Sequence, residues 1–132
     1  MVFAEWNDQF ELGVASMDSA HREFIQLLDR LNAVSMDGLP SLFAMLVEHT
    51  AQHFEQENRL MEVSAFPMLA IHREEHEYVL NILRETLRNV EAGDVTSGHV
   101  LAGEMLAWFE QHAASMDLAL ARHLEAAGYA AD

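Results

Sequence analysis

Apolar residues recur every three or four positions along four long segments of the chain, with polar residues between them. This is the period of an amphipathic α-helix, whereas a strand exposed on one face alternates with a period of two. In the first segment the inward stripe comprises His21, Phe24, Ile25, Leu28, Leu31 and Ser35. The pattern predicts four helices, at about 19–36, 41–62, 67–92 and 98–127, and the sequence shows no strand alternation.

Breaker residues separate these segments and indicate where the helices end. We expect Asp18 and Ser41 to be the N-caps of the first two helices, because short polar side chains accept hydrogen bonds from free backbone N–H groups. Residues 37–40 (Asp-Gly-Leu-Pro) end the first helix, Pro67 suits the first turn of the third, and the stretch 92–98 separates the last two. Long helices joined by short loops predict an all-α fold, an up-down-up-down antiparallel four-helix bundle.

The length of the chain suits one domain, which we expect to cover residues 1–132. An N-terminal arm, residues 1–18, has no sustained helical period and is interrupted by Gly13. The bundle itself is expected to occupy residues 19–127. We expect the arm to be extended and to pack its aromatic side chains onto the bundle, among them Phe3, Trp6 and Phe10.

Composition excludes several classes of function. The 132 residues include 22 acidic and 7 basic side chains, and the net charge of −15 disfavours binding to nucleic acid or to anionic membranes. No apolar run approaches the roughly 20 residues of a membrane-spanning helix, and the start lacks the features of a secretory signal. We therefore expect no membrane insertion, a cytoplasmic location and a monomer. Because the chain has no cysteine, a metal site would use nitrogen and oxygen ligands.

Eight histidines are many for a chain of this length, and most lie on predicted inward faces. In an antiparallel bundle the starts of the first and third helices lie beside the ends of the second and fourth. Each helix therefore contributes inward nitrogen or oxygen donors at a similar level. One such histidine would be an ordinary core residue, but a cluster leaves unpaired buried polar groups unless a metal binds them. The candidate ligands are His21, His53, Glu57, His72, His76, His112 and Asp117.

The spacing between His112 and Asp117 is irregular for two residues of one site. Five residues rotate an α-helix by about 500°, which turns Asp117 about 140° away from the face of His112. Either Asp117 is not a ligand or the helix is locally irregular. Because π-helical turns favour functional sites, we predict a departure from α-helical geometry within residues 112–117.

Two other metal-site patterns explain less of the sequence. The segment from His72 to His76 fits the H-x-x-E-H signature of one group of zinc proteases, with Glu75 as the base. That pattern leaves the histidines of the other three helices unexplained. Ferritin-like diiron enzymes need Glu-x-x-His pairs, and this sequence contains none. We therefore expect the protein not to be an enzyme.

Three histidines lie outside the candidate cluster. His49 lies one turn before His53 on the same face, and we interpret it as a partly buried, hydrogen-bonded residue or as a neighbour of the site. His99 lies about 20 Å from His112 along the predicted helix and is excluded. We treat His123 as a surface residue.

If two metal ions share the seven donors and a hydroxide, with both carboxylates bridging, one ion is six-coordinate and the other five-coordinate. Iron suits such a donor set, although manganese, cobalt and zinc also remain open. The motifs resemble those of the hemerythrins, specifically single-domain bacteriohemerythrins. The motifs that carry this resemblance are Asp18-x-x-His21, His53-x-x-x-Glu57, His72-x-x-x-His76 and His112-x-x-x-x-Asp117.

The resemblance implies two non-haem iron ions (Fe2+/Fe3+) with a bridging oxo or hydroxo group and carboxylate bridges from Glu57 and Asp117. One iron would be held by His72, His76 and His112, and the other by His21 and His53.

The function implied by the resemblance is reversible O2 binding, as hydroperoxide at the five-coordinate iron, for oxygen storage, transport or delivery to an O2-consuming protein. The alternative is an O2 or redox sensor, or an iron-handling protein, with the same site. An apolar pocket would protect bound O2 from water and acid. The candidate pocket residues are Phe24, Ile25, Leu28, Trp108 and Phe109.

Overall fold

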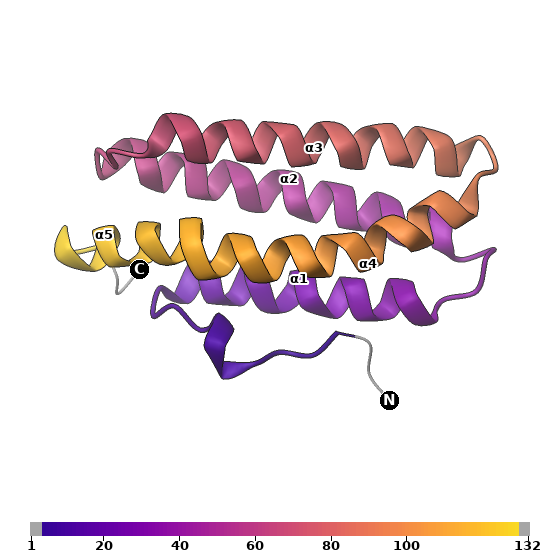
Figure 1. The fold of residues 1–132 in the computed structure, drawn as a ribbon, viewed down its shortest axis with the longest axis horizontal. Coiled ribbons are helices and arrows are strands. Elements are labelled where there is room, and N and C mark those ends of the chain that lie inside the picture. The colour runs from indigo at the N-terminus through magenta and orange to yellow at the C-terminus, as the bar shows by residue number, and fades with distance from the viewer. Residues whose placement is uncertain (1–3, 130–132) are drawn as a thin grey trace.

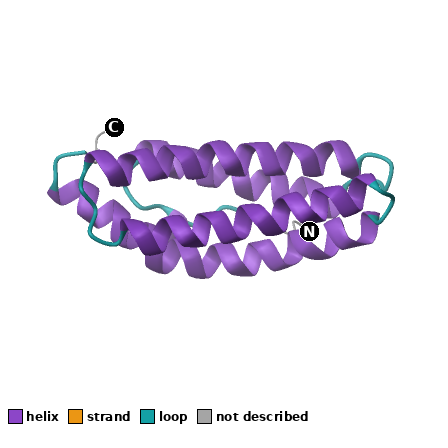
Figure 2. Cartoon of the chain, turned by 90° about the horizontal axis from the view of Figure 1, so that it is seen from above, coloured by secondary structure: helices purple, strands orange, loops and turns teal. Residues whose placement is uncertain are grey.

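Long helices that run back and forth make up the computed structural model, which describes residues 4–129 (Figure 1). The first helices are α1 (Ala15–Ala33), α2 (Leu39–Val63), α3 (Leu69–Glu91) and α4 (Val95–His112). A π-helix (Ala113–Asp117) and α5 (Leu118–Ala126) continue α4 in one rod. Helices α1 and α3 each pack against both α2 and α4. The predicted all-α four-helix bundle is confirmed, and residues 4–129 contain no strand (Figure 2).

The first helix begins one turn earlier than predicted, at Ala15, and the prediction of Asp18 as its N-cap is wrong. The buried carboxylate of Asp18 instead accepts hydrogen bonds from the backbone N–H groups of Leu12 (2.8 Å) and Gly13 (3.1 Å). Gly13 has a φ of 91°, which a residue with a side chain rarely adopts. Asp18 therefore joins the arm to α1.

The second helix also begins earlier than predicted, at Leu39, so Ser41 is not its N-cap. Pro40 lies in the first turn, where backbone N–H groups make no hydrogen bond within the helix. The lack of an N–H group in proline therefore costs nothing there. The third helix begins at Leu69, two residues after Pro67. In these three helices the starts are set by backbone conformation more than by polar caps, since none has a side-chain cap hydrogen bond.

The arm is extended except for a short 3-10 helix at Asp8–Phe10. The rings of Trp6 and Phe10 lie 5.6 Å apart, and the ring of Phe10 lies 5.3 Å from that of Phe109 on α4. Packing of these aromatic side chains on the bundle is therefore confirmed, while Phe3 lies outside the described residues.

We expect Asp18→Ala to lower the free energy of unfolding of the metal-free protein by about 2–4 kcal/mol, because it leaves two backbone N–H groups without their charged acceptor. Urea denaturation measures this change. Asp37→Ala, at an exposed loop position, is the matched control and should change stability by less than about 0.5 kcal/mol. Equal stability of the two variants would contradict the role of Asp18.

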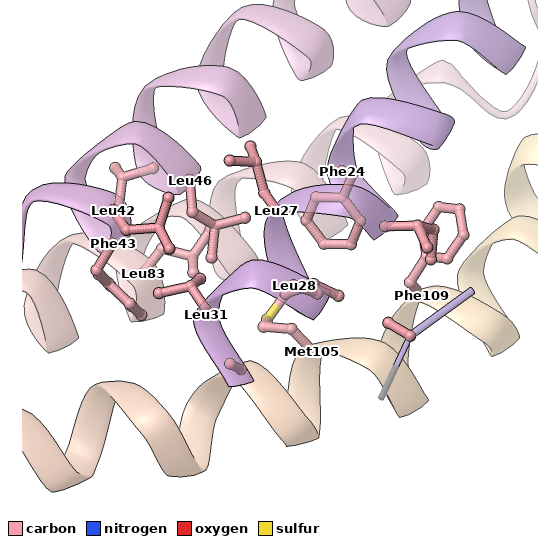
Figure 3. Close-up of a cluster of buried hydrophobic side chains, with 14 of the residues drawn as sticks. Phe24, Leu27, Leu28, Leu31, Leu42, Phe43, Leu46, Leu83, Met105 and Phe109 are labelled. Atoms are coloured by element: carbon pink, nitrogen blue, oxygen red, sulfur yellow. The ribbon is translucent and has the colours of Figure 1, made fainter. Parts of the chain in front are cut away.

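Two apolar clusters fill the bundle, and the candidate ligands lie between them. The larger cluster includes the side chains shown in Figure 3, from Phe24 through Leu83 to Phe109. The smaller one includes Met17, Met61 and Leu120, near the end of the bundle where α2 joins α3. The polar site is thereby separated from water along the bundle axis by apolar packing on both sides. Among the described helices, none combines the length and apolar character needed to cross a membrane.

Candidate metal centre

The four helices of the bundle, the fourth being α4 with its continuation through the π-helix and α5, bring all seven predicted ligands to one level. His21 lies in the second turn of α1 and His72 in the first turn of α3, with His76 one turn further along α3. The last turns of α2 contribute His53 and Glu57, and the fourth rod contributes His112 and Asp117. Each of these side chains is at most 7 % exposed. The structure thus contains the cluster of buried donors that was predicted from the level of each residue along the bundle, and all seven residues are buried.

The donor atoms form two groups that share the carboxylates. In the first group His72 and His112 place Nε2 at 3.1 and 2.9 Å from Oδ1 of Asp117. His76 belongs to the same group, with Nε2 at 3.2 Å from Oε1 of Glu57. This group contains three imidazoles and one oxygen from each carboxylate.

The second group comprises His21, His53 and the other oxygen of Glu57, and Oδ2 of Asp117 approaches it through His21 alone. His21 places Nε2 at 3.2 Å from both Oε2 of Glu57 and Oδ2 of Asp117. His53 places Nε2 at 2.8 Å from the same Oε2 of Glu57. Two imidazoles therefore face this side, against three on the other, and both carboxylates lie between the two groups. This division coincides with the one that the resemblance implies.

The unpaired polar atoms show that the site fits metal ions. Within the described residues, buried atoms without a hydrogen-bond partner include Nε2 of His72, His76 and His112, Oε1 of Glu57 and both carboxylate oxygens of Asp117. Unpaired buried groups of this kind are costly, and bound cations would satisfy them. Two ligands at right angles on one ion, with bonds of about 2.0–2.2 Å as in zinc sites, would lie about 3 Å apart. The nitrogen–oxygen separations given above match this spacing.

Electrostatics favour a cation at this place. Burial opposes charge on His21, but the carboxylates of Asp117 and Glu57 outweigh it and raise the pKa of His21 to about 10. The same balance raises the pKa of His72 to about 9. Although burial alone would raise the pKa values of Glu57 and Asp117, the surrounding histidines hold both well below the usual range. Burial lowers the pKa of His76. In the metal-free protein, protons on His21 and His72 therefore balance the two carboxylates.

A π-helix brings Asp117 into the site. The residues from Ala113 to Asp117 are π-helical, and the backbone N–H of Leu118 bonds to the carbonyl of Ala113, five residues before it. This turn takes one additional residue, so the five-residue step from His112 returns Asp117 to the inner face. The predicted departure from α-helical geometry within residues 112–117 is confirmed, and Asp117 is fully buried.

Residues that the sequence interpretation missed surround the imidazoles. Nδ1 of His76 lies 2.9 Å from Oδ1 of Asn58, which follows Glu57 in sequence. The ring of Phe54 stacks on that of His76 at 3.9 Å. On α2, Phe54 follows the predicted ligand His53 and Asn58 follows the predicted ligand Glu57. Phe54 and Asn58 are four residues apart and therefore lie on the same face of the helix. Their contacts with α3 nevertheless depend on how the two helices pack.

The three remaining histidines lie outside the donor cluster. His49 is half-buried, and its Nε2 donates to the carbonyl of Ala20 at 3.0 Å, which confirms a partly buried, hydrogen-bonded residue. His99 is exposed on α4. The prediction of His123 as a surface residue is wrong, because it is half-buried and its Nε2 donates to the carbonyl of Ser64 at 2.8 Å. His123 thus ties α5 to the end of α2.

A small cavity of about 10 Å³ adjoins the donor cluster. Of the predicted pocket residues, Phe24, Trp108 and Phe109 line it, together with Phe54 and the donors His53, His112 and Asp117. Ile25 and Leu28 do not line this cavity but are buried in the larger apolar cluster. Leu28 lies two helical turns, about 10 Å, beyond His21. A cavity of this size holds about one water-sized molecule.

Comparisons with known proteins agree with this geometry. The Hemerythrin HHE cation binding domain matches residues 12–124. A bacteriohemerythrin from Ralstonia nicotianae is 37 % identical over 117 residues, which cover 89 % of this chain and 85 % of the relative. A bacteriohemerythrin from Stenotrophomonas maltophilia is 26 % identical over 130 residues, covering 96 % of this chain and 84 % of the relative. The chain therefore belongs to the hemerythrin family and carries its cation-binding domain.

Proposed function

We propose that the protein binds O2 reversibly at a non-haem diiron centre, for storage, transport or delivery of O2. One iron would be held by His72, His76 and His112, the other by His21 and His53, with Glu57, Asp117 and an oxo or hydroxo group as bridges. We further propose that the protein is a monomer and that it supplies O2 to an O2-consuming protein. These two points rest on the sequence alone.

The observation that carries this proposal is the unequal division of the imidazoles. Three imidazoles cluster with one oxygen of each carboxylate, and two cluster with the other oxygen of Glu57, beside Oδ2 of Asp117. The second metal would therefore have one histidine ligand fewer. The donor His53 of that smaller group also lines the small cavity. When bound, the two irons would supply the electrons for reversible O2 binding and take them back on release.

The residues of the chain would keep the bound gas from water and protons. Four of the seven residues that line the cavity are Phe or Trp, and Phe109 packs edge-on against the ring of His21 at 5.0 Å. The ring of Phe24 lies 5.3 Å from that of Phe109. Five neutral imidazoles and two carboxylates also donate less negative charge to iron than a carboxylate-rich site would. This donor set favours carrying O2 over activating it.

Anaerobic loading with ferrous iron, followed by O2 exposure and removal under argon, tests the proposal. We expect about two irons per chain by elemental analysis and uptake of about one O2 per two irons, from the division of donors into two groups. Removal of O2 should restore the starting absorption spectrum. Immediate irreversible oxidation would contradict O2 carriage and favour a redox sensor, and iron uptake without any O2 binding would favour iron handling.

A further inference from the structure

Trp108 forms the outer wall of the small cavity beside the donor cluster. Of the described residues that line this cavity, six are buried and only Trp108 is half-buried. Its indole ring stacks on the ring of His112 at 4.5 Å, with an angle of 20° between the planes. It also meets the ring of Phe54 edge-on at 6.1 Å. Displacement of this one side chain would therefore widen the opening of the cavity at the surface.

A single hydrogen bond to a neighbouring helix holds the outer edge of the indole. Nε1 of Trp108 on α4 donates to Oε1 of Glu75 on α3 at 2.7 Å. Glu75 is the acidic residue of the His72-x-x-Glu75-His76 segment, yet it is not among the clustered donors. Its carboxylate is engaged outside the cluster, which disagrees with a role as a protease base. Glu75 thus contacts the cavity lining through its bond to Trp108.

We propose that Glu75 is a positioning residue that holds Trp108 over the cavity and thereby sets how fast a small apolar gas enters and leaves. The inference rests on the proposed function in one respect, namely that this gas is O2. Stacking alone lets an aromatic ring slide or swing, whereas the bond to Glu75 fixes its direction. Since the bond is made whether or not the cavity is filled, its loss should speed entry and exit equally.

Metal-free protein provides a test that does not depend on O2. The chain has two tryptophans, so a Trp6→Phe background leaves Trp108 as the fluorescent reporter. We expect Glu75→Ala to increase acrylamide quenching of Trp108 severalfold, because the indole is released toward solvent. Glu77→Gln, which removes a charge from an exposed position of the same helix, is the matched control and should leave quenching unchanged. Equal quenching in Glu75→Ala and the control would overturn the proposal.

Iron-loaded protein tests the effect on the gas. For Glu75→Ala we expect the O2 association and dissociation rates both to rise about tenfold, as loss of a hydrogen bond to a charged group implies, with their ratio unchanged. Glu75→Gln keeps an acceptor oxygen and should raise both rates less. If circular dichroism shows that Glu75→Ala is unfolded, Glu75→Gln takes its place in the test. A changed affinity with unchanged rates would overturn the proposal, since Glu75 would then act on the metal centre. If the unsubstituted protein binds no O2, the proposed function fails, while quenching still decides whether Glu75 holds Trp108.

Discussion

Glu57→Gln should reduce the iron content of the protein from the proposed two per chain to below one. The carboxylate of Glu57 lies within 3.5 Å of Nε2 of four histidines, and it offers one oxygen to each group of donors. An amide of the same shape has no negative charge and only one acceptor oxygen. Because loss even of residues around a metal ligand costs about 10–100-fold in affinity, loss of a shared ligand should cost more.

The same substitution is expected to destabilise the metal-free protein by about 3–5 kcal/mol near pH 6, as removal of one partner from a buried ion pair usually does. Elemental analysis and urea denaturation measure the two effects. Glu74→Gln, exposed on α3, makes the same change of charge and should alter neither quantity. Two irons per chain in Glu57→Gln would show that its carboxylate is not a shared ligand.

The metal-free protein should lose stability as the pH rises from about 6.5 to 10. Folding raises the pKa values of His21 and His72 to about 10 and 9, from the ordinary histidine value of 6.5. A raised pKa adds stability that is complete below the unfolded value and is lost as pH rises through the folded value. The lowered pKa values of His76 and the two carboxylates place their titration below this window. We expect a loss of several kcal/mol in urea denaturation between pH 6.5 and 10.

Bound metal should remove this dependence, because ligand nitrogens cannot hold a proton and a metal ion together. Adding a redox-inert divalent ion such as zinc at pH 7.5 should release about two protons from the histidines, besides any released from bound water. A pH-stat measures this release, which should vanish above the folded pKa values. The zinc-loaded protein is the control for denaturation. An equal fall in its stability between pH 6.5 and 10 would show that other groups cause the loss.

The sequence specified the members of the candidate site through two simple rules. Helical periodicity gives the face of each residue, and antiparallel topology gives its level along the bundle, so residues as distant as His21 and Asp117 could be placed together. The five-residue step from His112 also predicted a local departure from α-helical geometry, because a regular helix would have turned Asp117 away. These inferences needed no side-chain contacts, since they depend only on fixed rotation and rise per residue.

Only the tertiary structure decided the contacts that depend on helix packing and side-chain direction. Asp18 was expected to cap a helix, but its carboxylate binds the backbone of the arm, because that segment folds back within reach. His123 was assigned to the surface, yet it reaches the end of α2. The bond between Glu75 and Trp108 joins residues 33 positions apart, and no local spacing encodes it. Such contacts are set by the relative rotation of neighbouring helices, which the sequence pattern of one helix leaves open.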